Sequence, residues 1–170
     1  MKGFKPVLIV IPSNMSFVLK DDSLSIIDSY MNKFKEKGIK VCFSCSNDGW
    51  YLDKMTRPFN NENEYELKKG TKAYYNRLFD FCSKWDLGFH PMVSAHGIEH
   101  WEENFDWWME TLIERGFNPL SSIMFLEVRN DDWTDDKIIH YLKYLNHSAD
   151  YWAEKFFPTQ TDPNEALFMF

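Results

Sequence analysis

The chain has 170 residues, of which 44% are hydrophobic and 18% aromatic, so it can bury a packed core and is not expected to be disordered. Its formal net charge is -7 and it has no basic cluster, which argues against a nucleic-acid partner. No stretch approaches the roughly 20 apolar residues of a membrane span, and the three cysteines do not make a disulfide framework. We therefore expect a cytoplasmic protein with no membrane partner.

In the first half of the chain, apolar runs alternate with helical periodicity. Val7–Pro12 is a continuous β-branched run, which is typical of a strand covered on both faces. The apolar stripe within Ile27–Phe34 predicts a helix that ends near Gly38. Lys40–Ser46 is a second predicted strand, and the polar segment 47–70 that follows is long enough to be a lid, a binding loop or a mobile segment.

The second half of the chain repeats this alternation twice. Helices are predicted at about 71–85 and over the apolar stripe at 98–112, with a strand at Gly88–Ser94 between them. A fourth strand is predicted at Ser122–Val128, and Thr134 then caps a last helix. The inner face predicted for that helix consists of Ile138, Tyr141, Leu142 and Leu145.

Four consecutive βα units follow from this order, so the predicted fold class is α/β. Strands that are linked by helices run parallel, with right-handed crossovers. An open doubly wound sheet and an arc of a barrel both fit. We expect the arc, a partial (β/α) barrel of four parallel βα units over residues 1–157, followed by an irregular tail at 158–170. Four strands are too few to close a barrel, so the Val7–Ile11 strand should be an uncovered apolar edge.

Polar residues follow all four predicted strands, which is where sites lie in parallel α/β folds. Loop starts and helix caps explain any single one of them. Residues two apart share one face of a strand, as do Glu127 with Arg129, and His90 with Met92 and Ser94. A charged pair inside a strand must be paired or bind something. Inward-facing Glu127, Arg129 and His90 could bind a substrate's amine and carboxylate or move protons, and an internal Glu127–Arg129 salt bridge is an equal alternative.

Several phrases at the predicted strand ends carry a family resemblance. Ser46-Asn47-Asp48-Gly49 matches a Ser-x-Asp-Gly that ends a barrel strand in radical S-adenosylmethionine (radical SAM) enzymes, and Pro12-Ser13-Asn14 resembles the turn after the preceding strand in that family. The other phrases are Gly88–Val93, Leu126–Asp131 and Arg57-Pro58-Phe59. Over about residues 5–150, the chain resembles the C-terminal half of the barrel in the peptide-modifying, SPASM-type branch.

The resemblance implies that the chain helps to bind S-adenosylmethionine together with a peptide or protein substrate. The residues implied as contacts for the amino-acid or ribose groups of S-adenosylmethionine are Asn14, Ser44, Ser46 and Asp48. Glu127 and Arg129, with His90, would line the same cavity as catalytic residues. The family's Cys-x-x-x-Cys-x-x-Cys, which holds a 4Fe–4S cluster, is absent from this sequence.

Without that cluster the chain alone should not cleave S-adenosylmethionine reductively. We therefore expect a fragment or split half of a radical SAM enzyme, whose 4Fe–4S cluster is supplied by the missing barrel half or by a partner. An equally weighted alternative is a clusterless binding or assembly module, whose apolar edge strand pairs with another chain or with itself.

His96-Gly97-Ile98-Glu99-His100 supports a second alternative, a zinc-dependent hydrolase. The segment matches H-x-x-E-H, in which two histidines on one helical face bind zinc and the glutamate acts as the base. No third ligand is well placed, so an exposed first helical turn is the default interpretation. Cys42 and Cys45 lie three apart in a predicted strand and should point to opposite faces, which disfavours a shared metal.

Overall fold

The computed structural model describes residues 7–56 and 67–157, so the predicted tail at 158–170 and Arg57-Pro58-Phe59 lie outside the described residues. The first half contains β1 (Leu8–Ser13), the 3-10 helix η1 (Ser16–Leu19), α1 (Asp21–Glu36), β2 (Lys40–Cys45) and the one-turn helix α2 (Asp53–Thr56). The second half contains α3 (Lys72–Trp85), β3 (Met92–Val93), η3 (Ile98–His100), α4 (Trp101–Glu114), α5 (Pro119–Ser122), β4 (Leu126–Glu127) and α6 (Asp135–Phe156). Within these ranges, no helix is long and apolar enough to cross a membrane.

The strands do not form the predicted four-stranded arc. β1 pairs with β2 in parallel along its whole length, whereas β3 and β4 pair in parallel over two residues and form a second sheet. In the described part of the chain, single bridges alone join the two sheets, from Cys45 to Phe89 and from Phe89 to Ile123. The expectation of a partial (β/α) barrel of four parallel βα units is therefore wrong, although the parallel direction of both strand pairs is confirmed.

Two local features explain why the strand ladders are so short. The backbone N–H of Met92 donates to the carboxylate Oδ1 of Asp48 at 2.9 Å, so it does not extend a ladder with β2. Pro91 has no N–H to donate, which interrupts the pairing of this segment with the chain before β4. The sequence-based prediction treated Gly88–Ser94 as one continuous strand, and these two positions divide it.

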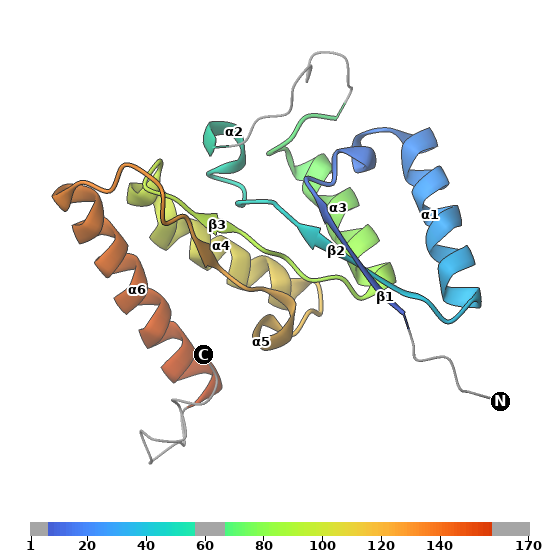
Figure 1. The fold of residues 1–170 in the computed structure, drawn as a ribbon. Helices are drawn as coiled ribbons and strands as arrows, with labels where there is room; N and C mark the ends of the chain where they lie inside the picture. Colours follow the sequence, from blue (N-terminus) through green and yellow to red (C-terminus); the bar gives the residue numbers. More distant parts are fainter. Residues whose placement is uncertain (1–6, 57–66, 158–170) are drawn as a thin grey trace.

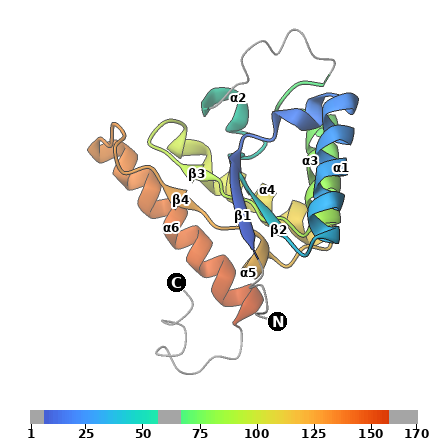
Figure 2. The same cartoon turned by 45° about the vertical axis from the view of Figure 1, so that its right-hand side comes forward.

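β1 is an edge strand, as predicted, because among the described residues it pairs with β2 alone. Leu8 and Val10 of this strand are 59% and 56% exposed. Figures 1 and 2 show α1 next to α3 at the β1 end of the molecule and α6 next to β4 at the other end. The β1 end of the strand layer thus carries apolar residues that no described element covers.

The core lies between the strands and the helices α3 and α4, which stand behind the strands in Figure 1. β2 alternates strictly, with Val41, Phe43 and Cys45 buried on the helix side. Phe89, which bridges the two sheets, packs against Phe79 of α3 and Trp108 of α4 at ring-centroid distances of 5.0 and 5.1 Å. These aromatic contacts hold the two short sheets together where backbone pairing is sparse.

The face that α6 turns inward differs from the predicted one. Tyr144 is 4% exposed and packs on Trp101 at a ring-centroid distance of 5.5 Å. Ile138, Leu142 and Leu145, which were predicted to face inward, are 41%, 52% and 37% exposed. Stacking of aromatic rings therefore sets the rotation of α6, and its aliphatic stripe remains uncovered by the described residues.

Candidate functional site

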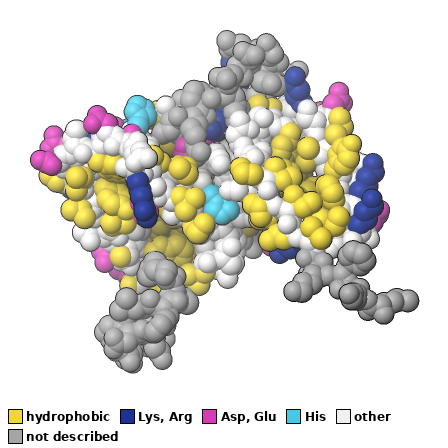
Figure 3. All heavy atoms as spheres, viewed as in Figure 1, with side chains coloured by type: hydrophobic (Ala, Val, Ile, Leu, Met, Phe, Trp, Pro, Cys, Tyr) yellow, Lys and Arg dark blue, Asp and Glu magenta, His cyan; other side chains and the backbone are white. Residues whose placement is uncertain are grey.

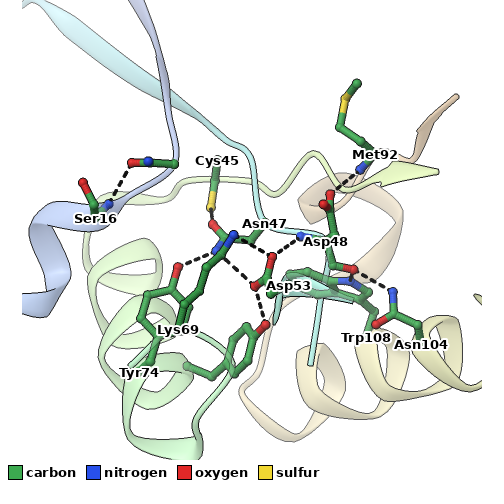
Figure 4. Close-up of polar contacts among 12 residues, drawn as sticks. Ser16, Cys45, Asn47, Asp48, Asp53, Lys69, Tyr74, Met92, Asn104 and Trp108 are labelled. Carbon is green, nitrogen blue, oxygen red and sulfur yellow. Dashed lines mark hydrogen bonds and ion pairs between the residues drawn. The ribbon is translucent and has the colours of Figure 1, made fainter. Parts of the chain in front are cut away.

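The turn after β2, which contains the Ser-x-Asp-Gly match, is held in a buried polar network (Figure 4). The carboxylate of Asp53 is its centre. One oxygen accepts from the ammonium of Lys69 at 3.0 Å and from the backbone N–H of Asp48 at 2.8 Å. The other accepts from the amide of Asn47 at 3.4 Å and from the hydroxyl of Tyr75. This network is shielded from water, because the side chains of Asp53 and Lys69 are both 0% exposed.

The charges in this network are compensated by their neighbours. Burial raises the pKa of the Asp53 carboxyl above its ordinary value, and the ammonium of Lys69, followed by the Tyr75 hydroxyl, opposes that rise. Burial, and then the negative charge of Asp53, also raises the pKa of Tyr75 well above its ordinary value, so its hydroxyl stays protonated and donates. A buried ion pair with this many hydrogen bonds is suited to fixing a turn rather than to exchanging protons with solvent.

The neighbouring residues of the turn are fixed in the same way. The backbone oxygen of Asp48 accepts from the Asn104 amide at 2.6 Å and from the Trp108 indole at 3.2 Å, both on α4. Gly49 has a φ of +109°, and a Cβ at that position would collide with both of these α4 side chains. Asp48 itself is 1% exposed and its carboxylate binds the N–H of Met92. The predicted cofactor contact Asp48 thus lies inside the protein and connects β2, β3 and α4.

Beside this turn, the strands have a second face that looks away from α3 and α4, which we call the open face. Ser44 of β2 lies on it, because its neighbours Phe43 and Cys45 point to the core. The hydroxyl of Ser44 lies 3.4 Å from Nδ1 of His90. Both side chains are half-buried, and burial lowers the pKa of His90 below its ordinary value of 6.5. The structure thus brings a predicted cofactor contact and a predicted catalytic residue together, with the imidazole neutral near pH 7.

The other predicted cofactor contacts lie at the same end of the strands. Ser46 is half-buried, and its backbone N–H donates to the oxygen of Ser13 at 2.9 Å, which aligns the ends of β1 and β2. Asn14 is exposed, and its side-chain oxygen accepts from the N–H of Ser16 at 3.1 Å. Asn14 therefore fixes the start of η1, whereas Ser46 lies two residues beyond Ser44 at the end of β2.

Glu127 and Arg129 lie apart from His90. Glu127 is in register with the buried Val93, so its side chain points to the helix side of the sheet, opposite to the open face. Its Oε1 accepts from the hydroxyl of Tyr141 on α6 at 3.0 Å. Arg129 is exposed, and no Glu127–Arg129 ion pair occurs within the described ranges. The structure therefore separates the two predicted catalytic charges from the predicted catalytic histidine.

The H-x-x-E-H segment does not form one helical turn. Gly97 has a φ of +78° and precedes η3, so the exposed His96 lies outside the helix that contains His100. In residues 7–56 and 67–157, no group of three or more His, Cys, Asp or Glu side chains is placed to hold a metal ion. Cys45 is buried and Cys42 is half-exposed on the open face, which confirms that the two thiols point in opposite directions.

Sequence reasoning missed the pair at the centre of the buried network. Asp53 and Lys69 both fall in the polar segment 47–70, which was predicted to be a lid, a binding loop or a mobile segment. A sequence signal for this network was available in Tyr74 and Tyr75. Both are buried in the first turn of α3, and each has a hydroxyl. Hydroxyls on a core-facing helix need buried partners, and a preceding segment rich in charge can supply them.

No protein-family model matches this sequence, and no significant match is found among curated proteins. These comparisons assign the chain to no family. The resemblance to radical SAM enzymes rests on the strand-end motifs alone, and the function has to be argued from the placement of the chain's own side chains.

Proposed function

We propose that this chain contributes part of the surface that binds S-adenosylmethionine and substrate in a cytoplasmic, peptide- or protein-modifying enzyme of the radical SAM type. The observation that carries the proposal is the contact between Ser44 and His90 on the open face, 3.4 Å apart. Ser46, two residues after Ser44, adds a second hydroxyl at the same end of the strand. Together these residues form the polar part of the proposed site.

The chemistry of these groups suits the amino-acid and ribose parts of S-adenosylmethionine. Serine hydroxyls donate and accept hydrogen bonds, and a neutral imidazole does the same through its two nitrogens. The half-buried Met92 lies two residues after His90 and on the same face, where it offers an apolar contact. α3 and α4 lie behind the strands (Figure 1), and Ser44 and His90 on the open face are only half-buried, so part of their surface is accessible.

In this proposal Asp48 positions the site and does not touch the ligand. Its carboxylate holds the N–H of Met92 and its backbone oxygen holds α4. These bonds fix the end of β2 relative to the segment that carries His90. A rigid frame of this kind keeps binding groups in place before the ligand arrives.

The described residues do not fit a 4Fe–4S cluster. Cys45 and Cys82 are buried, Cys42 points to the open face, and no cluster of three ligands forms within residues 7–56 and 67–157. The proposal therefore gives this chain binding and positioning roles, and the cluster would have to come from residues outside this sequence.

Calorimetric titration of the purified chain with S-adenosylmethionine tests the proposal. We expect binding, and we expect Ser44→Ala and His90→Gln each to weaken it by about three- to tenfold, the value of one hydrogen bond. The matched control is Ser25→Ala, because Ser25 is an exposed serine on α1, outside the strands. If the folded wild-type chain does not bind, or if both site variants bind like the control, the proposal is wrong.

The uncovered edge of β1 favours a second candidate, a binding or assembly module. Among the described residues the outer edge of β1 has no strand partner, and Leu8 and Val10 make that edge apolar, so it can pair with another polypeptide. The chain's net charge of -7 disfavours pairing with a second copy, so the occupant would be a different protein. If S-adenosylmethionine does not bind and a Val10→Lys variant loses a partner that the wild-type chain retains, the assembly function replaces the enzymatic one.

A further inference from the structure

A groove of about 620 Å³ opens between the end of β4 and the first half of α6, on the side of the sheet opposite to Ser44 and His90. The residues that line it are Glu127, Val128, Arg129, Trp133, Ile138, Tyr141 and Leu142. Figure 3 shows apolar side chains gathered over this end of the molecule, where α6 lies. The groove combines these apolar walls with two opposite charges.

The walls of the groove are aromatic and aliphatic. The rings of Trp133 and Tyr141 lie 5.3 Å apart at 57° and form one side. The indole N–H of Trp133 donates to the backbone oxygen of Val128 at 2.8 Å, which fixes the ring beside the strand. Ile138 and Leu142, on the same helix as Tyr141, are 41% and 52% exposed and add adjoining apolar surface. Such a surface suits an apolar ligand group.

The two charges lie at one rim of the groove. Glu127 ends β4 and Arg129 follows two residues later in a bend, and both side chains line the groove. The Tyr141 hydroxyl donates to Glu127 and holds its carboxylate. Burial, followed by this hydrogen bond, raises the pKa of Tyr141 to about 12, so the hydroxyl remains a donor. The pair thus presents a carboxylate and a guanidinium within reach of one small ligand.

We propose that this groove binds the zwitterionic head of an α-amino acid whose side chain is apolar. Arg129 takes the ligand carboxylate, Glu127 takes the ammonium, and the side chain lies against Trp133 and Tyr141. A ligand with one charge would leave the other protein charge unmatched. The proposal is independent of S-adenosylmethionine binding, because Ser44 and His90 occupy the other face of the sheet.

The test is calorimetric titration of the full chain with L-phenylalanine, N-acetyl-phenylalanine and phenylalaninamide. The last two compounds lack the ammonium and the carboxylate, respectively. We expect phenylalanine to bind in the millimolar range or tighter, and each blocked compound to bind at least about tenfold more weakly. Glu127→Gln should abolish the preference for phenylalanine over the acetyl compound, and Arg129→Gln the preference over the amide. Glu99→Gln, at an exposed glutamate on η3, is the matched control.

Two results would overturn the inference. One is the absence of phenylalanine binding by the folded wild-type chain, and the other is equal binding of all three compounds. S-Adenosylmethionine carries the same zwitterionic head, so it is titrated in parallel. If its binding is lost in Glu127→Gln and Arg129→Gln but kept in Ser44→Ala and His90→Gln, the groove is its site and the proposed open-face site is wrong.

Discussion

The turn after β2 and the end of β4 both place acidic residues where a parallel strand meets its loop, yet the two regions have opposite environments. Asp48 and Asp53 are 1% and 0% exposed, and α3 and α4 supply partners for their polar groups. Glu127 and Arg129 are exposed, and the described part of the chain places α6 alone beside them. The number of helices that cover a strand end therefore decides whether its charges are structural or accessible.

Acidic side chains therefore have different roles in the two regions. Buried polar groups must be fully hydrogen-bonded, so those after β2 are committed to holding the turn. The charges after β4 keep unused hydrogen-bonding capacity toward solvent, which a ligand can occupy. The Ser44–His90 contact lies between these extremes, since both side chains are half-buried.

The largest effect is expected from Asp53→Ala. This change removes the Asp53 carboxylate from its pair with the buried ammonium of Lys69, and breaking a buried pair in this way costs about 3–5 kcal/mol of unfolding free energy. Urea denaturation measures the loss. Asp132→Ala is the matched control. Asp132 is exposed and its carboxylate lies 3.8 Å from the ammonium of Lys137, so this surface ion pair is weak and its loss should change stability by less than about 1 kcal/mol. Equal losses in the two variants would show that the buried network does not hold the turn.

A smaller effect is expected from Gly49→Ala. Its φ of +109° disfavours any side chain, and the added Cβ would displace Asn104 and Trp108 from the oxygen of Asp48. We expect a loss of about 2–4 kcal/mol from strain together with broken hydrogen bonds. Gly38→Ala controls for strain alone, because its φ is +69° and no atom lies within 4 Å of the added Cβ. The cost of Gly38→Ala should be about 1–2 kcal/mol, the penalty for a side chain in the left-handed region, and a Gly49→Ala loss no larger than that of Gly38→Ala would contradict the packing argument.

The helices and the strand direction could be predicted because their signals are local. The helix predicted at 71–85 is observed as α3 (Lys72–Trp85), since a 3.6-residue apolar period needs no knowledge of distant residues. The extent of the sheets could not be predicted in this way. It depends on the contact between Asp48 and Met92, which are 44 residues apart.

Individual residues of the candidate site could be predicted from the sequence, but their arrangement in space could not. Ser44 and His90 were each singled out, yet their contact depends on the bridge between Cys45 and Phe89, which sets the register of two distant segments. The sequence-based prediction placed Glu127 and Arg129 on one strand face, but β4 ends at Glu127 and Arg129 lies in a bend beyond it. Which face Glu127 occupies follows from the register of β4 with β3, and a shift by one residue would have reversed it.

The smallest effect concerns the pH dependence that His90 contributes. Burial holds the pKa of His90 in the folded chain below the 6.5 of the unfolded chain. Between these two values the unfolded chain binds more protons, so stability rises with pH in that window. The stability that the neutral His90 contributes to the folded chain is fully present above pH 6.5 and is lost as the pH falls through the lowered pKa of His90.

NMR titration of the His90 ring protons measures this directly, and the midpoint should lie below 6.5. His90→Gln should remove the corresponding part of the pH dependence of urea stability. The Ser44–His90 site is less buried than the turn after β2 and more buried than the end of β4. A half-buried imidazole loses part of the hydration of its charged form, so its pKa should be lowered. A midpoint at or above 6.5 would mean that the open face is as well hydrated as the end of β4, and Ser44 and His90 would then belong with the accessible charges.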